Sequence, residues 1–470
     1  MVKLKNALER IVGSDNISDD EFEVVCYSRG WSVEGPNPPL IIVRPENKEQ
    51  IAEILRIASR MRIPVSPYGG NTELVGSHAK QAIALDMTAM RGVTEIDENS
   101  LTVTALAGTT WEEVFYELAK KGWRTGPHIH SAPSSTVGAG IVLCANGITG
   151  ARYGLVGHEV VGLEVVLPNG DILRTGSGAH PACKSFMRYA WGSDLTGLFI
   201  GSHGIFGVVT EATLNIYPLP EVEVVHGYEY ESIESAVNAL HQIQKRRIPL
   251  DMVYIQVPKT IKASFPTIKG NAALIPLVIA GTRDEVSVWE KQVDKICLKE
   301  GKEVVDAQAL DVATEVSKRI QYICPDYRAF AREWEGCSMQ ISLCDAVPTP
   351  DFPKFHHAFE DLCKEEKIEH YKIVAYCEGF ASAPNAVNAS ADVIYDERDP
   401  KSWQKAIDLA RKTTALFAGI GFAPQYVGRL KAIPDIMWRL GAYNEVIRTL
   451  KKVIDPNNIM NPGQLMTPEF

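Results

Sequence analysis

A glycine-rich turn between two apolar runs is the feature that most restricts how the first part of this chain can fold. The stretch PYGGNTELVG (residues 67–76) follows the apolar run 63–65 and precedes the apolar run 82–85. Because glycine carries no Cβ, such a turn lets the backbone approach a phosphate closely, although Gly-Gly-Asn is also ordinary turn chemistry. The stretch matches neither familiar phosphate loop, because the first lysine after it is Lys80 and it runs into a strand rather than a helix. Taken alone, the turn does not identify its ligand.

Two further stretches downstream are rich in small residues. APSSTVGAGIVLCANGITGARYG (132–154) places the hydroxyl groups of Ser134, Ser135 and Thr136 beside small residues. DLTGLFIGSHGIFGVVT (194–210) places small residues before an expected strand. Hydroxyl groups and backbone N–H groups can hold a pyrophosphate without a lysine. The three stretches together therefore favour a phosphate-bearing ligand more than any one of them does.

The composition indicates a globular protein of two or three domains. The chain has 470 residues, of which 45% are hydrophobic, and a formal net charge of −10. This charge argues against a nucleic-acid-binding protein, because phosphate binding needs a basic face. The N-terminus lacks the apolar core of a signal peptide, and no stretch approaches the roughly 18 apolar residues of a membrane span. The nine cysteines include no CxxC pair, so we expect neither a zinc ribbon nor an iron–sulfur cluster and place the chain in the reducing cytoplasm.

The order of expected strands and helices divides the chain near Pro220. Before it, short apolar strands alternate with helices, and Asn47 with Gln50 forms a predicted capping box at one of them. After it, strand–helix–strand units repeat, which predicts a ferredoxin-like antiparallel sheet with helices on one face. We therefore expect an α+β fold whose tail, DPNNIMNPGQL, returns to the first domain. The expected divisions are a helical segment 1–34, a first domain 35–220, a cap domain 221–440 and a C-terminal segment 441–470.

In this order, the three small-residue stretches resemble the flavin-binding domain of the vanillyl-alcohol oxidase / p-cresol methylhydroxylase (PCMH-type) superfamily. That superfamily includes the glycolate oxidase and D-lactate dehydrogenase flavoproteins. The resemblance runs from about residue 39 to residue 220 and resumes at DPNNIMNPGQL. It implies a PCMH-type FAD-binding domain of two α/β subdomains and a ferredoxin-like cap that carries the substrate chemistry. It also implies that the turn at 67–76 holds the FAD pyrophosphate.

The resemblance further implies which residues contact FAD. The first stretch would hold the diphosphate, and the second would line the flavin and the ribityl chain. Val208 and Val209 would lie by the adenine or the isoalloxazine edge, and Asn461 would reach the flavin from the tail. For each residue the alternative is a purely structural role in a turn. The implied contacts are Pro67, Tyr68, Gly69, Gly70, Asn71, Thr72, Gly76, Pro133, Ser134, Ser135, Thr136, Gly138, Asn146, Tyr153, Gly154, Gly204, Val208, Val209 and Asn461.

The cap region departs from the metal-assisted 2-hydroxy-acid members of the superfamily. Those members carry an H-x-G-D-G-N-x-H stretch and a later G-E-H-G. The corresponding stretch here is YCEGFASAPNAVNAS (376–390), and the last histidine of the chain is His370. Asp351 stands where those members place a carboxylate-binding arginine. A divalent ion needs several convergent ligands, which Glu378 alone does not supply, so we expect no metal-assisted 2-hydroxy-acid site.

A second branch of the superfamily oxidises para-substituted phenols and holds the phenolate with tyrosines and an arginine, which stabilise the oxyanion. By this resemblance the anchors would be Tyr68 together with Tyr426 and Arg429, which lie a few residues after the position of the branch's tyrosine–arginine pair. This branch often links the flavin covalently through a histidine or a tyrosine of the cap. No histidine lies in the matching region, so we expect non-covalent FAD, with a tyrosyl link through Tyr376 as the alternative.

Histidines and arginines supply further candidates for the substrate site. His130, which with His128 precedes the flavin-lining stretch, is the expected base for a substrate hydroxyl, and His203 is a second candidate. The alternative for each is a hydrogen-bonded turn histidine. Arg328 and Arg332 could bind a substrate carboxylate in bidentate fashion, but a solvent-exposed helix charge is the favoured interpretation.

These features predict an FAD-dependent dehydrogenase acting on CH–OH or benzylic CH groups. It would take hydride from a hydroxylated small molecule (an alcohol, a 2-hydroxy acid or a para-substituted phenol) and pass electrons to an acceptor protein or subunit. The alternative is a flavin-carrying subunit that relays electrons within a complex and has no substrate of its own. A closed polar pocket beside the flavin favours the enzyme, and an exposed apolar patch on the cap favours the relay. A homodimer is compatible with both predictions.

Overall fold

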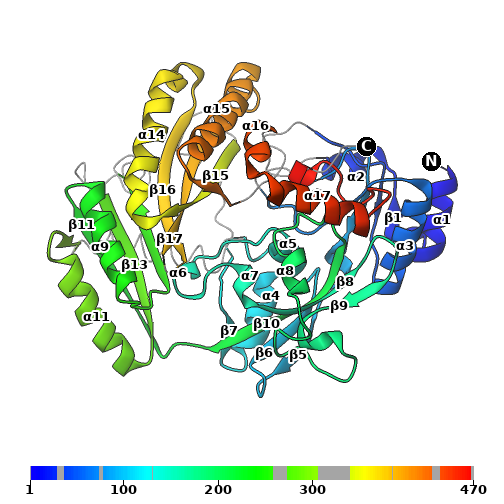
Figure 1. The fold of residues 1–470 in the computed structure, drawn as a ribbon, viewed down its shortest axis with the longest axis horizontal. Helices are drawn as coiled ribbons and strands as arrows, with labels where there is room; N and C mark the ends of the chain where they lie inside the picture. Colours follow the sequence, from blue (N-terminus) through cyan, green and yellow to red (C-terminus); the bar gives the residue numbers. More distant parts are fainter. Residues whose placement is uncertain are drawn as a thin grey trace.

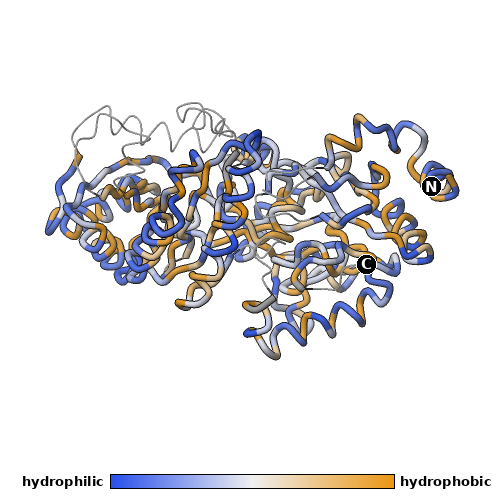
Figure 2. Tube along the Cα trace, turned by 90° about the horizontal axis from the view of Figure 1, so that it is seen from above, coloured by the Kyte–Doolittle hydropathy of each residue, from blue (hydrophilic) through white to orange (hydrophobic). Residues whose placement is uncertain are grey.

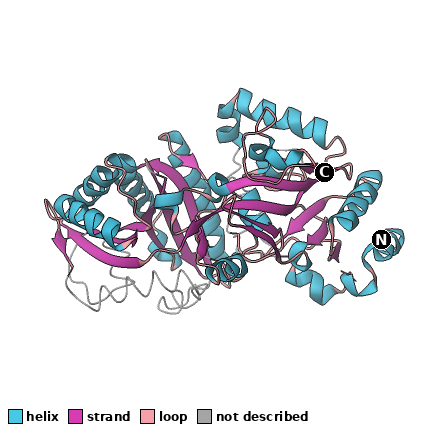
Figure 3. Ribbon diagram, turned by 90° about the horizontal axis from the view of Figure 1, so that it is seen from below, coloured by secondary structure: helices cyan, strands magenta, loops and turns pink. Residues whose placement is uncertain are grey.

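The structure is a computed structural model of the chain. Figure 1 shows two N-terminal sheets on one side of the molecule and a larger sheet with its covering helices on the other, and both termini lie on the N-terminal side. In Figure 3 most strands lie in the interior and most helices lie on the outside. The described residues are 2–28, 36–73, 78–129, 131–257, 273–304, 339–383, 385–425 and 434–466.

The first N-terminal sheet is small and mostly parallel. Its described strands are, in order across the sheet, β1 (Ile17–Ser18), β2 (Ile41–Val43), β4 (Ile83–Asp86) and β3 (Val65–Tyr68). β2, β4 and β3 run parallel, and β2 and β4 are buried along their whole length, as expected for parallel strands covered on both faces. The helices of this part are α1 (Val2–Val12), α2 (Glu21–Cys26) and α3 (Lys48–Met61).

Helix α3 begins at the predicted cap, with one difference in its hydrogen bonds. The Asn47 side chain accepts a hydrogen bond from the Gln50 backbone N–H at 2.9 Å. The Gln50 side-chain oxygen accepts from the backbone N–H of Glu46 at 2.7 Å, so the reciprocal bond closes one residue before the predicted position. The apolar side of the helix, including Ile51 and Leu55, packs in the core of the N-terminal half.

The second N-terminal sheet is antiparallel and shares this core. Its described strands are, in order, β5 (Val93–Asp97), β6 (Thr102–Leu106), β10 (Val208–Pro218), β8 (Val160–Val166) and β9 (Ile172–Arg174), and β7 (Trp123–Thr125) also pairs with β10. β8 and β9 form an antiparallel hairpin. One hydrophobic core runs from Leu4 to Met460 through both sheets, so the two sheets pack as one body. The helices here are α4 (Trp111–Ala119), α5 (Val137–Val142), α6 (Gly150–Tyr153), α7 (Val156–Glu159) and α8 (Leu195–Phe199).

The third sheet, which we call the cap sheet, consists of two ferredoxin-like units joined edge to edge. The first unit contains β11 (Val222–Tyr230), α9 (Ile233–Lys245), β12 (Met252–Gln256), β13 (Ala273–Gly281), α11 (Arg283–Cys297) and β14 (Lys302–Glu303). The second contains β15 (Met339–Pro348), α14 (Phe352–Glu365), β16 (Val374–Ala383), β17 (Ala386–Tyr395), α15 (Pro400–Gly419) and β18 (Ala423–Pro424). The described order is β14-β11-β13-β12-β16-β17-β15-β18, in which β12 and β16 join the units. The predicted ferredoxin-like cap in an α+β fold is thus confirmed.

Alternation along the cap strands gives the sheet two different faces. Helices α9, α11, α14 and α15 cover one face, and in Figure 2 the helices alternate between hydrophilic and hydrophobic positions along their length. The other side, which we call the inner face, points toward the N-terminal half. There Tyr254 and Phe380 form a small apolar cluster with Ile148 of the N-terminal half. Successive strand residues point to opposite faces, so the polar residues of the inner face recur at every second position.

The C-terminal segment lies against the first sheet after the cap ends. It contains α16 (Pro434–Met437) and α17 (Ala442–Ile454), and Figure 1 shows α17 beside the N-terminal half. The Val65 backbone N–H donates to the Ile459 carbonyl at 2.7 Å, and the Asn461 N–H donates to the Val65 carbonyl at 2.9 Å. The tail therefore lies alongside β3, next to the first glycine-rich stretch. The domain divisions at 34, 220 and 440 stay a prediction.

Candidate active site

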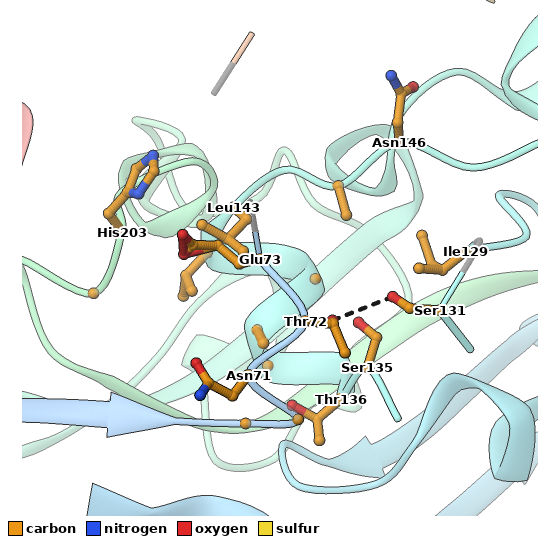
Figure 4. A pocket seen from close by; sticks show the side chains of 18 of the residues that line it. Asn71, Thr72, Glu73, Ile129, Ser131, Ser135, Thr136, Leu143, Asn146 and His203 are labelled. Atoms are coloured by element: carbon orange, nitrogen blue, oxygen red, sulfur yellow. Dashed lines mark hydrogen bonds between the residues drawn. The ribbon is translucent and has the colours of Figure 1, made fainter. Parts of the chain in front are cut away.

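A cavity lies where the glycine-rich stretches of the N-terminal half meet the inner face of the cap sheet. Its volume is about 290 Å³, close to the lower end of small-molecule sites, roughly 300–1,000 Å³. Figure 4 shows hydroxyl-bearing and amide side chains from separate segments around it. The N-terminal half contributes residues 67–73, His78, Met87, Ala107, Ile129, Ser131, Ser135, Thr136, Gly138, Ala139, Gly140, Val142, Leu143, Ala145, Asn146, His203, Gly204, Gly207, Val208 and Val209, and the tail contributes Asn461.

The first glycine-rich stretch leaves β3 and packs directly on the second. A Cβ at Gly70 would lie 1.8 Å from the Ser134 carbonyl oxygen, so this contact of two backbones requires glycine. The Thr72 and Ser131 hydroxyl groups lie 3.2 Å apart, as the dashed line in Figure 4 marks. Asn71 adopts a positive φ of 53°, which is uncommon outside glycine and frequent at functional turns. The two stretches therefore form one continuous cavity wall.

The second stretch turns into helix α5 at Thr136. Thr136 is the N-cap residue, but its side chain makes no cap hydrogen bond. Its buried hydroxyl has no hydrogen-bond partner among the described residues, although it lines the cavity. A Cβ at Gly138 would lie 2.8 Å from the Ala107 Cβ, so the helix start sits tightly against the end of β6. Buried hydroxyl groups are nearly always paired, so the Thr136 hydroxyl points to a ligand.

The third stretch is fixed by the C-terminal tail. The Asn461 side-chain N–H donates to the His203 carbonyl at 2.7 Å, and its oxygen accepts from the Ser66 hydroxyl at 2.8 Å. His203 adopts a positive φ of 51°, and burial lowers the pKa of its imidazole to about 4. Its Nδ1 atom is buried and has no hydrogen-bond partner in the described part of the chain. A neutral imidazole with an unused ring nitrogen therefore borders the cavity.

The buried ammonium group of Lys451 holds the tail in place. It donates to the Ile205 carbonyl at 2.8 Å and to the Met460 carbonyl at 2.6 Å, and it pairs with Asp455. Burial lowers the pKa of Lys451, and the Asp455 charge opposes that shift. The lysine thus connects α17, the third stretch and the tail at the cavity.

Three neighbouring strands of the cap sheet supply a polar wall opposite the glycine-rich stretches. Glu378, Ser390 and Cys344 lie side by side across β16, β17 and β15. Asp392 lies opposite Ser342 in the next row, and Phe380 lies opposite Asn388 in the row on the other side. The Ser342 and Ser390 hydroxyl groups lie 2.6 Å apart. All of these side chains line the cavity: Ser342, Cys344, Glu378, Phe380, Asn388, Ser390 and Asp392.

The cap wall carries two acidic side chains, Glu378 and Asp392. Burial, together with the charge of Asp392, raises the pKa of Glu378 to about 8. Among the described lining residues, His78 and His203 are the basic side chains, and neither lysine nor arginine occurs. Within the same described part, no three His, Cys, Asp or Glu side chains lie close enough together to hold a metal ion.

Ion pairs and a hydrogen bond attach the cap to the N-terminal half beside the cavity. The buried carboxylate of Asp251 accepts from Arg124 at 2.6 Å and from Arg152 at 2.8 Å. The Asn146 side-chain N–H donates to the Gln425 side-chain oxygen at 2.9 Å. These contacts cross from the N-terminal half to the cap and fix the distance between the cavity walls.

Most of the residues that the resemblance implied do border the cavity. Pro133, Ser134, Tyr153 and Gly154 are not among the lining residues. The Tyr153 hydroxyl accepts from Arg124 at 2.8 Å, so it faces the junction with the cap. Gly76, His130, Arg328, Arg332, Tyr426 and Arg429 lie outside the described residues. The lining residues are Pro67, Tyr68, Gly69, Gly70, Asn71, Thr72, Ser135, Thr136, Gly138, Asn146, Gly204, Val208, Val209 and Asn461.

The described side chains that the sequence suggested for catalysis or for a covalent flavin link do not all point into the cavity. The Tyr68 hydroxyl donates to the Tyr27 carbonyl at 3.2 Å, and the Tyr68 ring stacks on His78, so the hydroxyl is directed to the N-terminal segment. The His128 ring packs edge-on against Phe115 and does not line the cavity. Tyr376 lies on β16 opposite Asp392 and is also not a lining residue.

Sequence reasoning missed most of the cap wall. Asn388, Ser390 and Asp392 stand at every second position of β17, and Ser342 and Cys344 do so on β15. This two-residue spacing of polar groups in otherwise apolar strands was the available signal. The pairing of the three strands, which brings the groups together, is not visible in the sequence.

Comparisons with known proteins agree with this architecture. A family model described as an FAD binding domain matches residues 39–176, and one described as the C-terminal domain of FAD linked oxidases matches residues 219–465. The chain is 26% identical to the glycolate oxidase subunit GlcD of Bacillus subtilis (strain 168), covering 99% of this chain and 97% of that protein. It is 31% identical to a probable mitochondrial D-lactate dehydrogenase of Danio rerio, covering 98% and 92%.

The fold is also found among solved structures. A 4-ethylphenol oxidase from Gulosibacter chungangensis superimposes with a TM-score of 0.85 at 17% identity, covering 100% of this chain and 97% of that one. This likeness shows a common fold. No helix in the described part of the chain is long and apolar enough to cross a membrane.

Both family models match in the order that the three stretches and the cap predict, and the second covers more than half of the chain. The resemblance to PCMH-type flavoproteins is therefore confirmed, and FAD is the cofactor. The protein is an FAD-dependent oxidoreductase, and the chain belongs to the family of FAD-linked oxidases.

Proposed function

We propose that FAD binds in the cavity between the three glycine-rich stretches and that a hydroxylated substrate is oxidised between FAD and the cap wall. The observation that carries this proposal is the single cavity that joins those stretches to a polar sheet face of a second domain. Two buried polar atoms of its wall, Thr136 Oγ1 and His203 Nδ1, lack a partner among the described residues. A bound cofactor rich in hydrogen-bonding groups would satisfy both.

The chain's own residues suggest how the diphosphate is held. Because no lysine or arginine occurs among the described lining residues, hydroxyl groups and backbone N–H groups have to bind it. Thr72, Ser131 and Ser135 supply the hydroxyl groups beside the close backbone contact of Gly70. Val208 and Val209 contribute apolar surface for a ring, and Asn461 closes the site from the tail.

When bound, FAD would supply the acceptor for one hydride, which carries the two electrons of the oxidation. The substrate carbon loses its hydrogen as hydride, the hydroxyl oxygen loses its proton to a base, and a carbonyl compound is formed. We retain His130, which lies outside the described residues, as the proposed base. The cap wall holds and orients the substrate hydroxyl groups, and the burial of its residues excludes water from the reacting carbon.

The electrons then leave to an acceptor protein or subunit. The name of the Bacillus subtilis relative marks it as a subunit, which supports transfer within an assembly. A polar wall inside the cavity supports a substrate of the protein's own over a pure relay role.

Anaerobic bleaching of the flavin absorbance tests the proposed function. The purified protein is mixed with simple alcohols, 2-hydroxy acids and para-alkylphenols, and dithionite serves as the control reductant. We expect saturable bleaching by one hydroxylated class. Bleaching by dithionite alone would instead support the relay subunit.

A further inference from the structure

We propose that the cap wall recognises an uncharged polyhydroxy compound, through Asn388, Asp392 and Glu378, and that it rejects substrates that carry a carboxylate. This inference rests on the proposed function, because it places the oxidised substrate between FAD and the cap sheet. It deepens that function by naming the substrate class.

The arrangement of the wall fits several hydroxyl groups at once. Polar side chains occupy consecutive rows of one sheet face, with Ser390 between Glu378 and Cys344 and with Asp392 opposite Ser342. Directly opposite residues on neighbouring strands lie about 5 Å apart. This spacing matches hydroxyl groups on a short carbon chain or a sugar ring, which lie a few ångströms apart. A substrate with one hydroxyl group would meet only one of these rows.

The side chain of Asn388 is the second, independent observation. It is fully buried and lines the cavity, and neither its amide oxygen nor its amide nitrogen has a hydrogen-bond partner among the described residues. An amide needs both an acceptor and a donor opposite it, and a hydroxyl group provides both. A carboxylate would serve only the amide nitrogen. The unpaired amide therefore points to a ligand hydroxyl.

The carboxyl groups add charge selection to this pattern. Glu378 and Asp392 both line the cavity, and neither lysine nor arginine occurs among the described lining residues to neutralise an anion. The Asp392 carboxylate accepts hydrogen bonds from ligand hydroxyl groups and repels a ligand carboxylate, whereas Glu378, whose pKa is raised to about 8, keeps its proton at neutral pH and pairs with a ligand hydroxyl group. Phe380, beside Asn388, offers an apolar surface for the C–H side of the same ligand.

Matched pairs of compounds test this selection. D-sorbitol with D-gluconate, xylitol with D-xylonate and glycerol with glycerate differ by one terminal CH₂OH or carboxylate group. Each is mixed anaerobically with the holoenzyme, and the rate of flavin bleaching is measured against concentration. We expect at least one neutral member to bleach the flavin at least tenfold faster than its acid partner.

Other outcomes of the same experiment overturn the inference. If hydroxylated compounds bleach the flavin but no neutral member does so at least tenfold faster than its acid partner, or if only D-lactate or glycolate bleaches the flavin, the inference is wrong while the proposed function stands. If no hydroxylated compound bleaches a flavin that dithionite reduces, both are wrong.

Variants of the cap wall test which of its residues select neutral over acidic substrates. Asp392→Asn combined with Glu378→Gln should reduce the neutral-to-acid ratio of kcat/KM at least fivefold, and Asn388→Ala should raise KM for the neutral compound at least tenfold with a smaller change in kcat. Val393→Ala, on the helix-covered side of the same strand, is the matched control and should leave the ratio unchanged. An unchanged ratio in the double variant, with the flavin spectrum retained, would contradict the assignment.

Discussion

At the residue scale, single contacts decide whether the cavity keeps its shape. Gly70 stands against the Ser134 carbonyl, and a rigid backbone atom cannot move aside as a flexible side chain can. The sequence predicted this turn because its glycines and flanking strands are local signals. It did not predict that the Tyr68 hydroxyl turns to Tyr27, because that bond joins the turn to a segment 41 residues away.

Replacing Gly70 tests the close contact of the two stretches. In Gly70→Ala the new Cβ would force the first stretch away from Ser134, so we expect the purified protein to retain at least tenfold less FAD per chain. The ratio of flavin absorbance to protein absorbance measures this loss. Gly419→Ala is the control, because its Cβ would meet no atom within 4 Å, and it should retain FAD fully. Equal FAD content in both variants would argue against the contact.

Glu159 predicts a pH dependence of stability. Its carboxyl group accepts from the Tyr217 hydroxyl at 2.9 Å, and burial raises its pKa from 4.5 to about 7. Between these values the unfolded chain ionises while the folded chain keeps the proton. The free energy of unfolding therefore falls as pH rises from 4.5 to 7, by about 3 kcal/mol at most.

Chemical denaturation at several pH values measures this effect. In Glu159→Gln the titration is removed and an acceptor for Tyr217 is kept, so the variant should lose less stability than the wild type between pH 5 and pH 8. Parallel pH profiles for the two proteins would contradict the assignment.

At the element scale, strand alternation and the returning tail build the site. Local periodicity predicted the strands, the helices and the repeated strand–helix–strand units after Pro220. Periodicity did not predict the junction of β12 with β16 or the order of β16, β17 and β15, because the pairing of strands distant in the sequence leaves no periodic signal. For that reason Asn388 and Asp392 were missed, whereas the return of the tail was expected because the family resemblance resumes at DPNNIMNPGQL.

Lys451 tests the role of the tail as an element. In Lys451→Met two carbonyl groups lose their donor and the buried Asp455 carboxylate loses its partner, which typically costs about 3–5 kcal/mol. We expect a lower unfolding temperature and weaker FAD binding, measured by thermal unfolding with and without added FAD. Lys452→Met, at the neighbouring exposed lysine, is the control and should change neither the unfolding temperature nor FAD binding.

At the scale of the whole molecule, the cavity exists only while the cap stays on the N-terminal half. Arg124 and Arg152 both bind the buried carboxylate of Asp251 at this junction. Both arginines are far from Asp251 in the sequence, so neither composition nor motifs indicated this contact. The cap wall and the glycine-rich wall of the cavity therefore lie on opposite sides of this junction, which a few charged side chains hold together.

Removing that carboxylate tests the junction. In Asp251→Ala the buried Arg124 and the partly buried Arg152 lose their shared carboxylate, so the cap should loosen and expose the bound flavin to solvent. We expect stronger quenching of flavin fluorescence by iodide and at least a tenfold lower kcat. Asp361→Ala, which removes an exposed pair with Lys364, should leave both unchanged. Unaltered quenching in the Asp251 variant would show that other contacts hold the cap.

The central claim is that substrate is oxidised between FAD and the cap wall, and the rate of anaerobic flavin reduction in Asn388→Ala tests it most directly. The compound that reduces the wild-type flavin fastest is used at a series of concentrations, with dithionite as the control. The account predicts full flavin content and normal reduction by dithionite, but a half-saturating substrate concentration at least tenfold higher than in the wild type. The same half-saturating concentration in the variant would contradict it, because the substrate would then bind away from the cap wall.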